Sequence, residues 1–191
     1  YPLTSMEVLQ KVVAPESLGE PLAVINPLNV GQERMRTSLR ASVLECLVKN
    51  IRVARGQLAL FEVARVYLPG KEALPQENEH VVGVVTGARI DRWWRPTAEL
   101  VDFFDVKGYV MRLFESLGVE VSVVAEDDYG LLSGRSAALF VGDDRVGTVG
   151  QVHPDMARFF GLDQAAFLFE VRLELLLPHV PPVMRYKPVS K

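Results

Sequence analysis

The sequence predicts an α+β domain in which a mainly antiparallel sheet is flanked by helices. Apolar, strand-like runs follow one another in groups, and helical segments interrupt them irregularly rather than after every strand. Gly142-Asp143-Asp144 joins two of these runs and is typical of a tight hairpin turn. The 191 residues, of which 49% are hydrophobic, can bury a sizeable core without disulfides or metals.

The start of the chain predicts a short helix followed by a short strand. Residues 5–13 (SMEVLQKVV) form the helix, which Thr4 or Ser5 can cap and Pro15 ends. Residues 21–29 (PLAVINPLN) are typical of a strand that runs into a turn, because an Asn-Pro pair breaks the run.

The strongest helical pattern covers residues 36–55. Thr37 or Ser38 can cap its start, and Gly56 can end it. Cys46, the only cysteine, lies in this stretch and is expected to be a buried thiol without a chemical role. Apolar residues recur on one face at spacings of three or four, namely Leu39, Val43, Leu47, Ile51 and Ala54.

The remainder of the chain supplies most of the sheet. Residues 58–68 (LALFEVARVYL) form a strand that Pro69-Gly70 closes, and Asp102 caps a second amphipathic helix. Pro154 is expected at the first position of a short helix that ends before Gly161. The other predicted strands are residues 80–87, 119–124, 135–141, 145–152 and 165–177.

Composition argues against several classes of protein. A formal net charge of −3 gives no global sign of a nucleic-acid or membrane binder. No apolar run approaches the about 20 residues of a membrane span, and no secretory signal opens the chain. A single cysteine fits a reducing compartment, so we expect a cytoplasmic protein with no membrane partner.

The familiar catalytic and metal-binding motifs are absent from the sequence. It contains no GxxxxGK[ST] loop, no HExxH, no CxxC, and no GxGxxG between a strand and a helix. His80 and His179 are expected to be solvated, and His153 is expected to be a turn residue rather than a general base. The pairs Asp127-Asp128 and Asp143-Asp144 are interpreted as loop acids.

Arginines crowd the long helix, and two tryptophans flanked by arginines follow in a later loop. Arginines and aromatic rings can stack on RNA bases. A solvated helix face and a loop anchored by tryptophan explain the same pattern, and the negative net charge favours that simpler interpretation. The candidate interface or RNA-contacting residues are Arg36, Arg40, Arg52, Arg55, Trp93 and Trp94.

The four letters LFEV occur twice, at residues 60–63 and 168–171, each time in an apolar strand. Side chains alternate along a strand, so Glu62 shares a face with apolar residues such as Leu60 and Val66. A carboxylate buried there is costly unless it is paired or hydrogen-bonded. Glu62 and Glu170 are therefore expected either to bind a substrate or to anchor the sheet through an arginine or backbone N–H groups.

Residues 25–69 (INPLNVGQERMRTSLRASVLECLVKNIRVARGQLALFEVARVYLP) resemble the core of the beta-subunit family of bacterial phenylalanyl-tRNA synthetase. That family has an NPL turn, an MRTSL helix start and an FE-containing strand in this order. Later stretches agree in the same order, namely DFFDVKGYVMRLFESLG, GRSA, VGTVGQVHP and LFEVRLELL. Three positions depart from the family, with Leu132-Ser133 in place of His-Pro and Ala64 in place of Gly.

The resemblance implies a fold like the catalytic domain of class II aminoacyl-tRNA synthetases, but without catalysis. Active domains carry a phosphate-binding arginine soon after the FE strand, where this chain has Leu68 and Pro69. Near the end, Arg172 is present, but the glycines that let a nucleotide approach are not. We therefore expect no catalytic, cofactor-binding or metal-binding residues, and we expect Glu62 and Glu170 to be structural sheet acids.

The resemblance also implies the surroundings of the domain. Residues 1–183 would be a catalytic-like core that lacks its first helix, and residues 184–191 would begin a linker to a further domain. The partners would be an alpha subunit that carries the active site, a second beta subunit, and tRNA bound through the whole complex. That complex joins phenylalanine to tRNA with ATP and magnesium, and this domain would support the active site and the tetramer.

Two alternatives remain open from the sequence. One is a stand-alone ATP-dependent amino-acid ligase on the same fold, with Glu62, Arg65 and His153 in its site. The other is an RNA-binding module that uses the arginine-rich helix and the tryptophan pair, and its binding would weaken steeply with salt.

Overall fold

A computed structural model of the chain describes residues 2–53, 56–70, 74–89 and 99–182. Several expectations fall outside these ranges. They are Ala54 and Arg55 at the end of the long helix, Trp93 and Trp94 in the loop, and the linker at 184–191.

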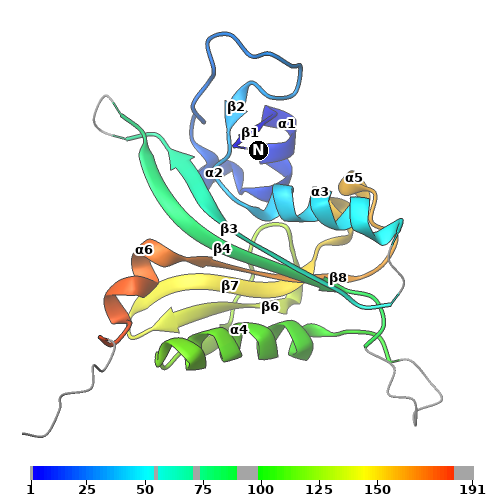
Figure 1. Ribbon diagram of the computed structural model, residues 1–191, viewed down its shortest axis with the longest axis vertical. Coiled ribbons are helices and arrows are strands. Elements are labelled where there is room, and N and C mark those ends of the chain that lie inside the picture. The colour runs from blue at the N-terminus through cyan, green and yellow to red at the C-terminus, as the bar shows by residue number, and fades with distance from the viewer. Residues whose placement is uncertain (1, 54–55, 71–73, 90–98, 183–191) are drawn as a thin grey trace, which may run out of the picture.

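The predicted α+β fold with an antiparallel sheet is confirmed. Six strands pair in the order β3-β4-β8-β7-β6-β5, and every neighbouring pair is antiparallel (Figure 1). The hairpin predicted at Gly142 joins two of these strands. Their bounds are β3 Leu58–Leu68, β4 Gln76–Thr86, β5 Ser122–Ala125, β6 Leu131–Val141, β7 Asp144–Val152 and β8 Ala166–Arg172.

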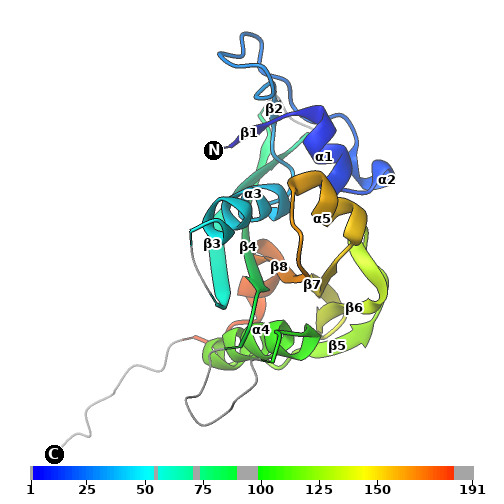
Figure 2. The ribbon, with the colours of Figure 1, turned by 90° about the vertical axis from the view of Figure 1, so that its right-hand side faces the viewer.

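Helices cover both faces of the sheet. The helices α1, α3 and α5 lie on one face and α4 lies on the other (Figure 2). Each face has its own apolar core. The helix bounds are α1 Met6–Val12, α2 Pro15–Leu18, α3 Arg40–Ile51, α4 Phe103–Leu117, α5 Pro154–Phe160 and α6 Leu173–Leu176. The short strands β1 Leu3–Thr4 and β2 Arg34–Met35 pair with each other, and a 3₁₀ turn covers Leu177–His179.

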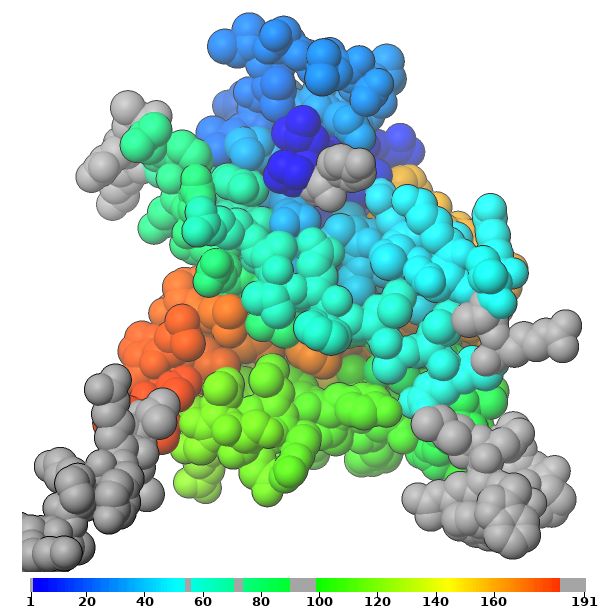
Figure 3. All heavy atoms as spheres, in the orientation of Figure 1, coloured from blue at the N-terminus to red at the C-terminus, as the bar shows by residue number. Residues whose placement is uncertain are grey.

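The side chains of strand β8 alternate between the two cores. Leu168 contributes to the core under α3, and Phe167 and Phe169 contribute to the core under α4. Period-2 alternation therefore sends Glu170 to the α3 face. Strand β3 lies at the edge of the sheet, and Phe61 on its other face is 77% exposed. Figure 3 shows the β3 residues at the surface, above the green residues of α4.

Two helix starts have the caps that the sequence predicts, and a third is capped by a residue that was predicted only as a turn residue. The Ser5 hydroxyl accepts a hydrogen bond from the Val8 N–H at the start of α1. Asp102 and Asp105 form a reciprocal capping box at the start of α4. His153 is the N-cap of α5, as its interpretation as a turn residue requires, and its ring accepts from the Asp155 N–H.

Other expectations about the first part of the chain are wrong. The helix α3 begins at Arg40 rather than residue 36, because Ser38 and Leu39 bond to a sheet carboxylate before the helix starts. In the segment 21–29 only Ala23 makes a bridge, so no strand forms there. Cys46 is exposed, because it lies on the side of α3 that faces away from the core.

The close packing of strands β7 and β8 requires glycine at position 147. A Cβ atom there would lie 2.4 Å from the Glu170 carbonyl oxygen, a backbone atom that cannot move alone. We expect Gly147→Ala to lower the free energy of unfolding by about 2 kcal/mol. Gly108→Ala on α4 is the matched control, since nothing lies within 4 Å of its added Cβ. We expect this control to raise stability by about 0.5–1 kcal/mol. Urea unfolding measures both, and equal effects would contradict the packing argument.

Candidate functional site

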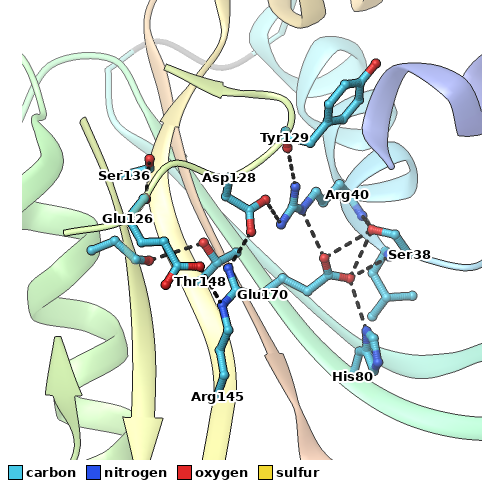
Figure 4. Close-up of polar contacts among 12 residues, drawn as sticks. Ser38, Arg40, His80, Glu126, Asp128, Tyr129, Ser136, Arg145, Thr148 and Glu170 are labelled. Atoms are coloured by element: carbon cyan, nitrogen blue, oxygen red, sulfur yellow. Dashed lines mark hydrogen bonds and ion pairs between the residues drawn. The ribbon is translucent and has the colours of Figure 1, made fainter. Parts of the chain in front are cut away.

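The site is a polar layer between the start of α3 and the sheet, and Glu170 lies at its centre (Figure 4). The Glu170 carboxylate accepts hydrogen bonds from the Ser38 hydroxyl at 3.1 Å and the Leu39 N–H at 3.0 Å. Arg40 Nε donates to it at 3.0 Å, and His80 Nδ1 lies 3.2 Å from it. The side chain is buried, so these contacts replace its hydration.

Glu62 makes the equivalent connection nearer the edge of the sheet. Arg36 donates to Glu62 Oε1 at 2.8 Å, and the Ser42 hydroxyl donates to Oε2 at 2.6 Å. The Glu62 side chain is 31% exposed, so it is less buried than the sequence suggested. Both LFEV carboxylates thus have partners, and each is bonded to the segment that begins α3.

A second acid extends the layer around Arg40. The Arg40 guanidinium lies 2.8 Å from this acid, Asp128, and also donates to the Tyr129 carbonyl at 2.7 Å. Arg145 of β7 pairs with the same Asp128 at 2.8 Å and with Glu126 at 3.1 Å. Arg40 therefore joins three parts of the fold: its own helix, strand β8, and the segment between β5 and β6 (Figure 4).

The pKa shifts follow from this arrangement. Burial would raise the pKa of Glu170, but the hydrogen bond with His80, the charge of Arg40 and the Leu39 N–H together lower it to about 2. Burial also opposes ionisation of Asp128, yet Arg40 and Arg145 hold its pKa below the usual value. Burial alone would lower the pKa of Arg40, but the neighbouring carboxylates of Glu170 and Asp128 have the larger effect, so the pKa of Arg40 is raised. The charged forms of Glu170, Asp128 and Arg40 are therefore favoured in the folded chain.

The arginines of the proposed RNA surface differ in their exposure to solvent. Arg36 and Arg40 are buried in the ion pairs described above, so they do not form a solvated face. Arg52 is exposed at the end of α3. Arg55, Trp93 and Trp94 lie outside the described residues.

The residues required by the ligase alternative do not converge. Glu62 faces α3, whereas Arg65 lies on the opposite face of β3 and pairs with Glu77 at 2.8 Å. The Arg65 side chain is 57% exposed. His153 caps α5 and its ring binds the Asp155 N–H instead of a β3 residue.

Sequence reasoning missed His80 and Asp128. His80 was expected to be solvated, but it lies within β4, is 7% exposed and contacts Glu170. Asp128 was interpreted as a loop acid, yet it binds Arg40 and Arg145. His179, also expected to be solvated, pairs with Asp144 at 2.7 Å. The signal for His80 was its place in the predicted strand 80–87, where alternation puts it on the same face as Val82, the residue that pairs with Glu170.

The resemblance links two places in the chain to nucleotide binding. Leu68 and Pro69 stand where the resemblance would require a phosphate-binding arginine, and neither side chain can donate a hydrogen bond. Arg172 donates to the Arg145 carbonyl instead of facing an open site. Within the described ranges, no cluster of three or more histidine, cysteine or acidic side chains is arranged to hold a metal ion.

The architecture is that of a class II aminoacyl-tRNA synthetase domain. A pyrrolysyl-tRNA synthetase, PylSc of Desulfitobacterium hafniense, matches with a TM-score of 0.69 over 93% of this chain and 57% of its own, at 15% identity. A second pyrrolysyl-tRNA synthetase structure from that organism gives a TM-score of 0.65 over 93% of this chain and 60% of its own, at 14% identity. At these identities the likeness concerns the fold.

The chain belongs to the family of phenylalanyl-tRNA synthetase beta chain CLM domains, whose model matches residues 1–173. The phenylalanine–tRNA ligase beta subunit of Dehalococcoides mccartyi (strain CBDB1) is 38% identical over all of this chain. This chain spans 24% of that subunit, so it corresponds to about a quarter of the relative's length. Among the described residues, no helix is both long and apolar enough to cross a membrane.

Proposed function

We propose that this chain is a non-catalytic scaffold domain of a phenylalanyl-tRNA synthetase beta subunit. Its role is to support the active site of an alpha subunit and to hold two alpha and two beta subunits together in the cytoplasm. The complex as a whole attaches phenylalanine to tRNA with ATP and magnesium. On this proposal Glu62 and Glu170 are structural acids, and residues 1–183 form the catalytic-like core before a linker.

One observation carries the proposal: the carboxylates on the α3 face of the sheet are already bonded to the chain itself. In the ligase alternative this face must bind a substrate, and its acids must be available. Instead, Glu170 is held by Ser38, Leu39 and Arg40. Glu62 is held in the same way by Arg36 and Ser42. The polar groups thus fasten α3 to the sheet, and that rigidity suits a scaffold.

Calorimetric titration with ATP and magnesium, with and without phenylalanine, tests the loss of the nucleotide site. We expect no binding heat from the chain once circular dichroism shows that it is folded, and the alpha subunit gives the positive control. Saturable binding that is lost on Arg65→Ala would contradict the proposal and favour the ligase alternative. Light scattering of the complete complex tests assembly. Deletion of this domain should prevent the tetramer from forming, so the measured molar mass should fall below that of the tetramer. An unchanged mass would refute the scaffold role.

A further inference from the structure

Strand β3 forms one edge of the six-stranded sheet, and the first half of that edge carries no further strand. At its far end the Tyr67 N–H donates to the Arg36 carbonyl at 2.9 Å, and Arg36 Nε donates to the Arg65 carbonyl at 2.9 Å. The backbone groups of every second residue therefore point away from β4. Within the described residues, three earlier members of this series have no backbone partner on the outer side, namely Ala59, Phe61 and Val63.

Residues 58–64 (LALFEVA), which we call the open edge, lack the features that usually protect a sheet edge. They include no lysine, proline or glycine, and their register with β4 has no bulge. The opposite edge of the sheet is protected by its shortness, since β5 has only four residues. The one charged side chain of the open edge, Glu62, is already paired with Arg36 at 2.8 Å. A further strand can therefore add to the open edge.

Apolar side chains accompany the open edge on the face that carries α4. Phe61 is 77% exposed and Val63 is 54% exposed. The helix α4 packs on β4, β7 and β8, and a hollow of about 240 Å³ remains between α4 and β3. Exposed apolar surface beside unpaired backbone groups is typical of a site for strand addition. Most residues that line the hollow are apolar, among them Phe61, Val81, Val85, Leu113 and Phe169.

A second copy of this chain matches the open edge by symmetry. The open edge runs from the first residue of β3 to the residue before Arg65, where Arg36 occupies the outer side. Phe61 is the middle residue of this stretch, and its backbone groups point outward. A twofold axis at Phe61 therefore pairs the whole stretch with its own copy in antiparallel register.

The side chains agree with this register. Phe61 lies beside Phe61 of the second copy, and aromatic pairs across two strands are stabilising. Ala59 lies opposite Val63, so a small side chain faces a larger one. Glu62 lies opposite Leu60, so the two carboxylates do not face each other.

We propose that the open edge pairs with the open edge of a second copy and joins the two sheets into one. The backbone groups of the open edge then find partners, and the Phe61 rings bury apolar surface that one chain alone exposes. The proposed scaffold function does not specify any surface between two copies, so this inference goes beyond it.

Cysteine cross-linking tests the register of the pairing. Exposed Cys46 is first replaced by serine. Position 59 of one copy lies opposite position 63 of the other, with Cα atoms about 5.5 Å apart, which a disulfide can span. Two positions 63 lie about 14 Å apart, as do two positions 59, and no disulfide spans that distance. We expect co-expressed Ala59→Cys and Val63→Cys chains to form a covalent dimer on mild oxidation, whereas either variant alone does not.

Sedimentation velocity of the 191-residue chain measures the association itself. We expect the mass to rise from that of one chain to that of two as the concentration increases. Phe61→Lys places two like charges at the axis and should weaken association about a hundredfold. Circular dichroism should be unchanged, because the Phe61 side chain is exposed. The matched control is Phe104→Lys, which changes a 71% exposed phenylalanine on α4 and should leave association unchanged.

Three results would overturn the proposal: a chain that stays monomeric at every concentration, cross-links as strong in a single variant as in the mixture, and equal association of Phe61→Lys and the wild type. The cross-linking is repeated in the complete protein. A cross-link seen only in the 191-residue chain would show that another segment covers the open edge in the complete protein, and it would equally overturn the pairing. The ATP titration does not depend on self-association, so this proposal and the proposed function fail separately.

Discussion

Arg40→Met should lower the free energy of unfolding by about 4 kcal/mol. The substitution keeps most of the side-chain length but removes the guanidinium that pairs with Glu170 at 3.0 Å and Asp128 at 2.8 Å. Both carboxylates remain away from water with fewer partners, and the loss of one partner of a buried ion pair is more costly than the loss of the pair. Urea unfolding at pH 7, followed by circular dichroism, measures the change.

Arg158→Met is the matched control for this prediction. Arg158 pairs with Asp155 on the surface of α5, where its side chain is 78% exposed, so the same substitution should have little effect. A double variant, Arg40→Met with Glu170→Leu, should recover part of the lost stability because one uncompensated charge is gone. If Arg40→Met were no more harmful than Arg158→Met, Arg40 would not be holding the three parts of the fold together.

The sheet was predictable because its strands carry strong local patterns. LFEV in an alternating apolar run fixed which face of β3 would be covered, and the structure places Val66 in the core and Phe61 outside it. The same alternation predicted that Glu62 needs a partner. Asp102 and Ser5 were recognisable as caps because a cap is read within three or four residues.

The site was less predictable because its contacts join residues far apart in the chain. Glu170 lies 130 residues from Arg40 and 90 from His80, and no local pattern records those separations. Arg40 was interpreted as part of a solvated helix face, since arginines are mostly exposed. The two acids that pair with Arg40, the buried Glu170 and the partly buried Asp128, come from β8 and the β5–β6 segment. Only the order of strands in the sheet brings them together.

Acid should remove a specific part of the stability through Glu170. Its pKa is lowered from 4.5 to about 2 in the folded chain, so ionised Glu170 stabilises the fold at pH values above the unfolded pKa. This contribution is lost as the pH falls from 4.5 towards 2. A shift of this size corresponds to about 3 kcal/mol. Urea unfolding of the wild type and Glu170→Gln at several pH values from 7 to 2 measures it.

The two stability curves should differ most at neutral pH and converge as Glu170 is protonated, because glutamine has no proton to gain. Leu47→Ala is the control for lost stability alone. Leu47 is fully buried in the α3 core and has no charge, so its curve should stay at a constant distance below the wild type. Parallel curves for Glu170→Gln and the wild type would show that the partners of Glu170 do not favour its ionised form. The charged cluster would then not be what holds α3 to the sheet, and shape complementarity alone would have to do so.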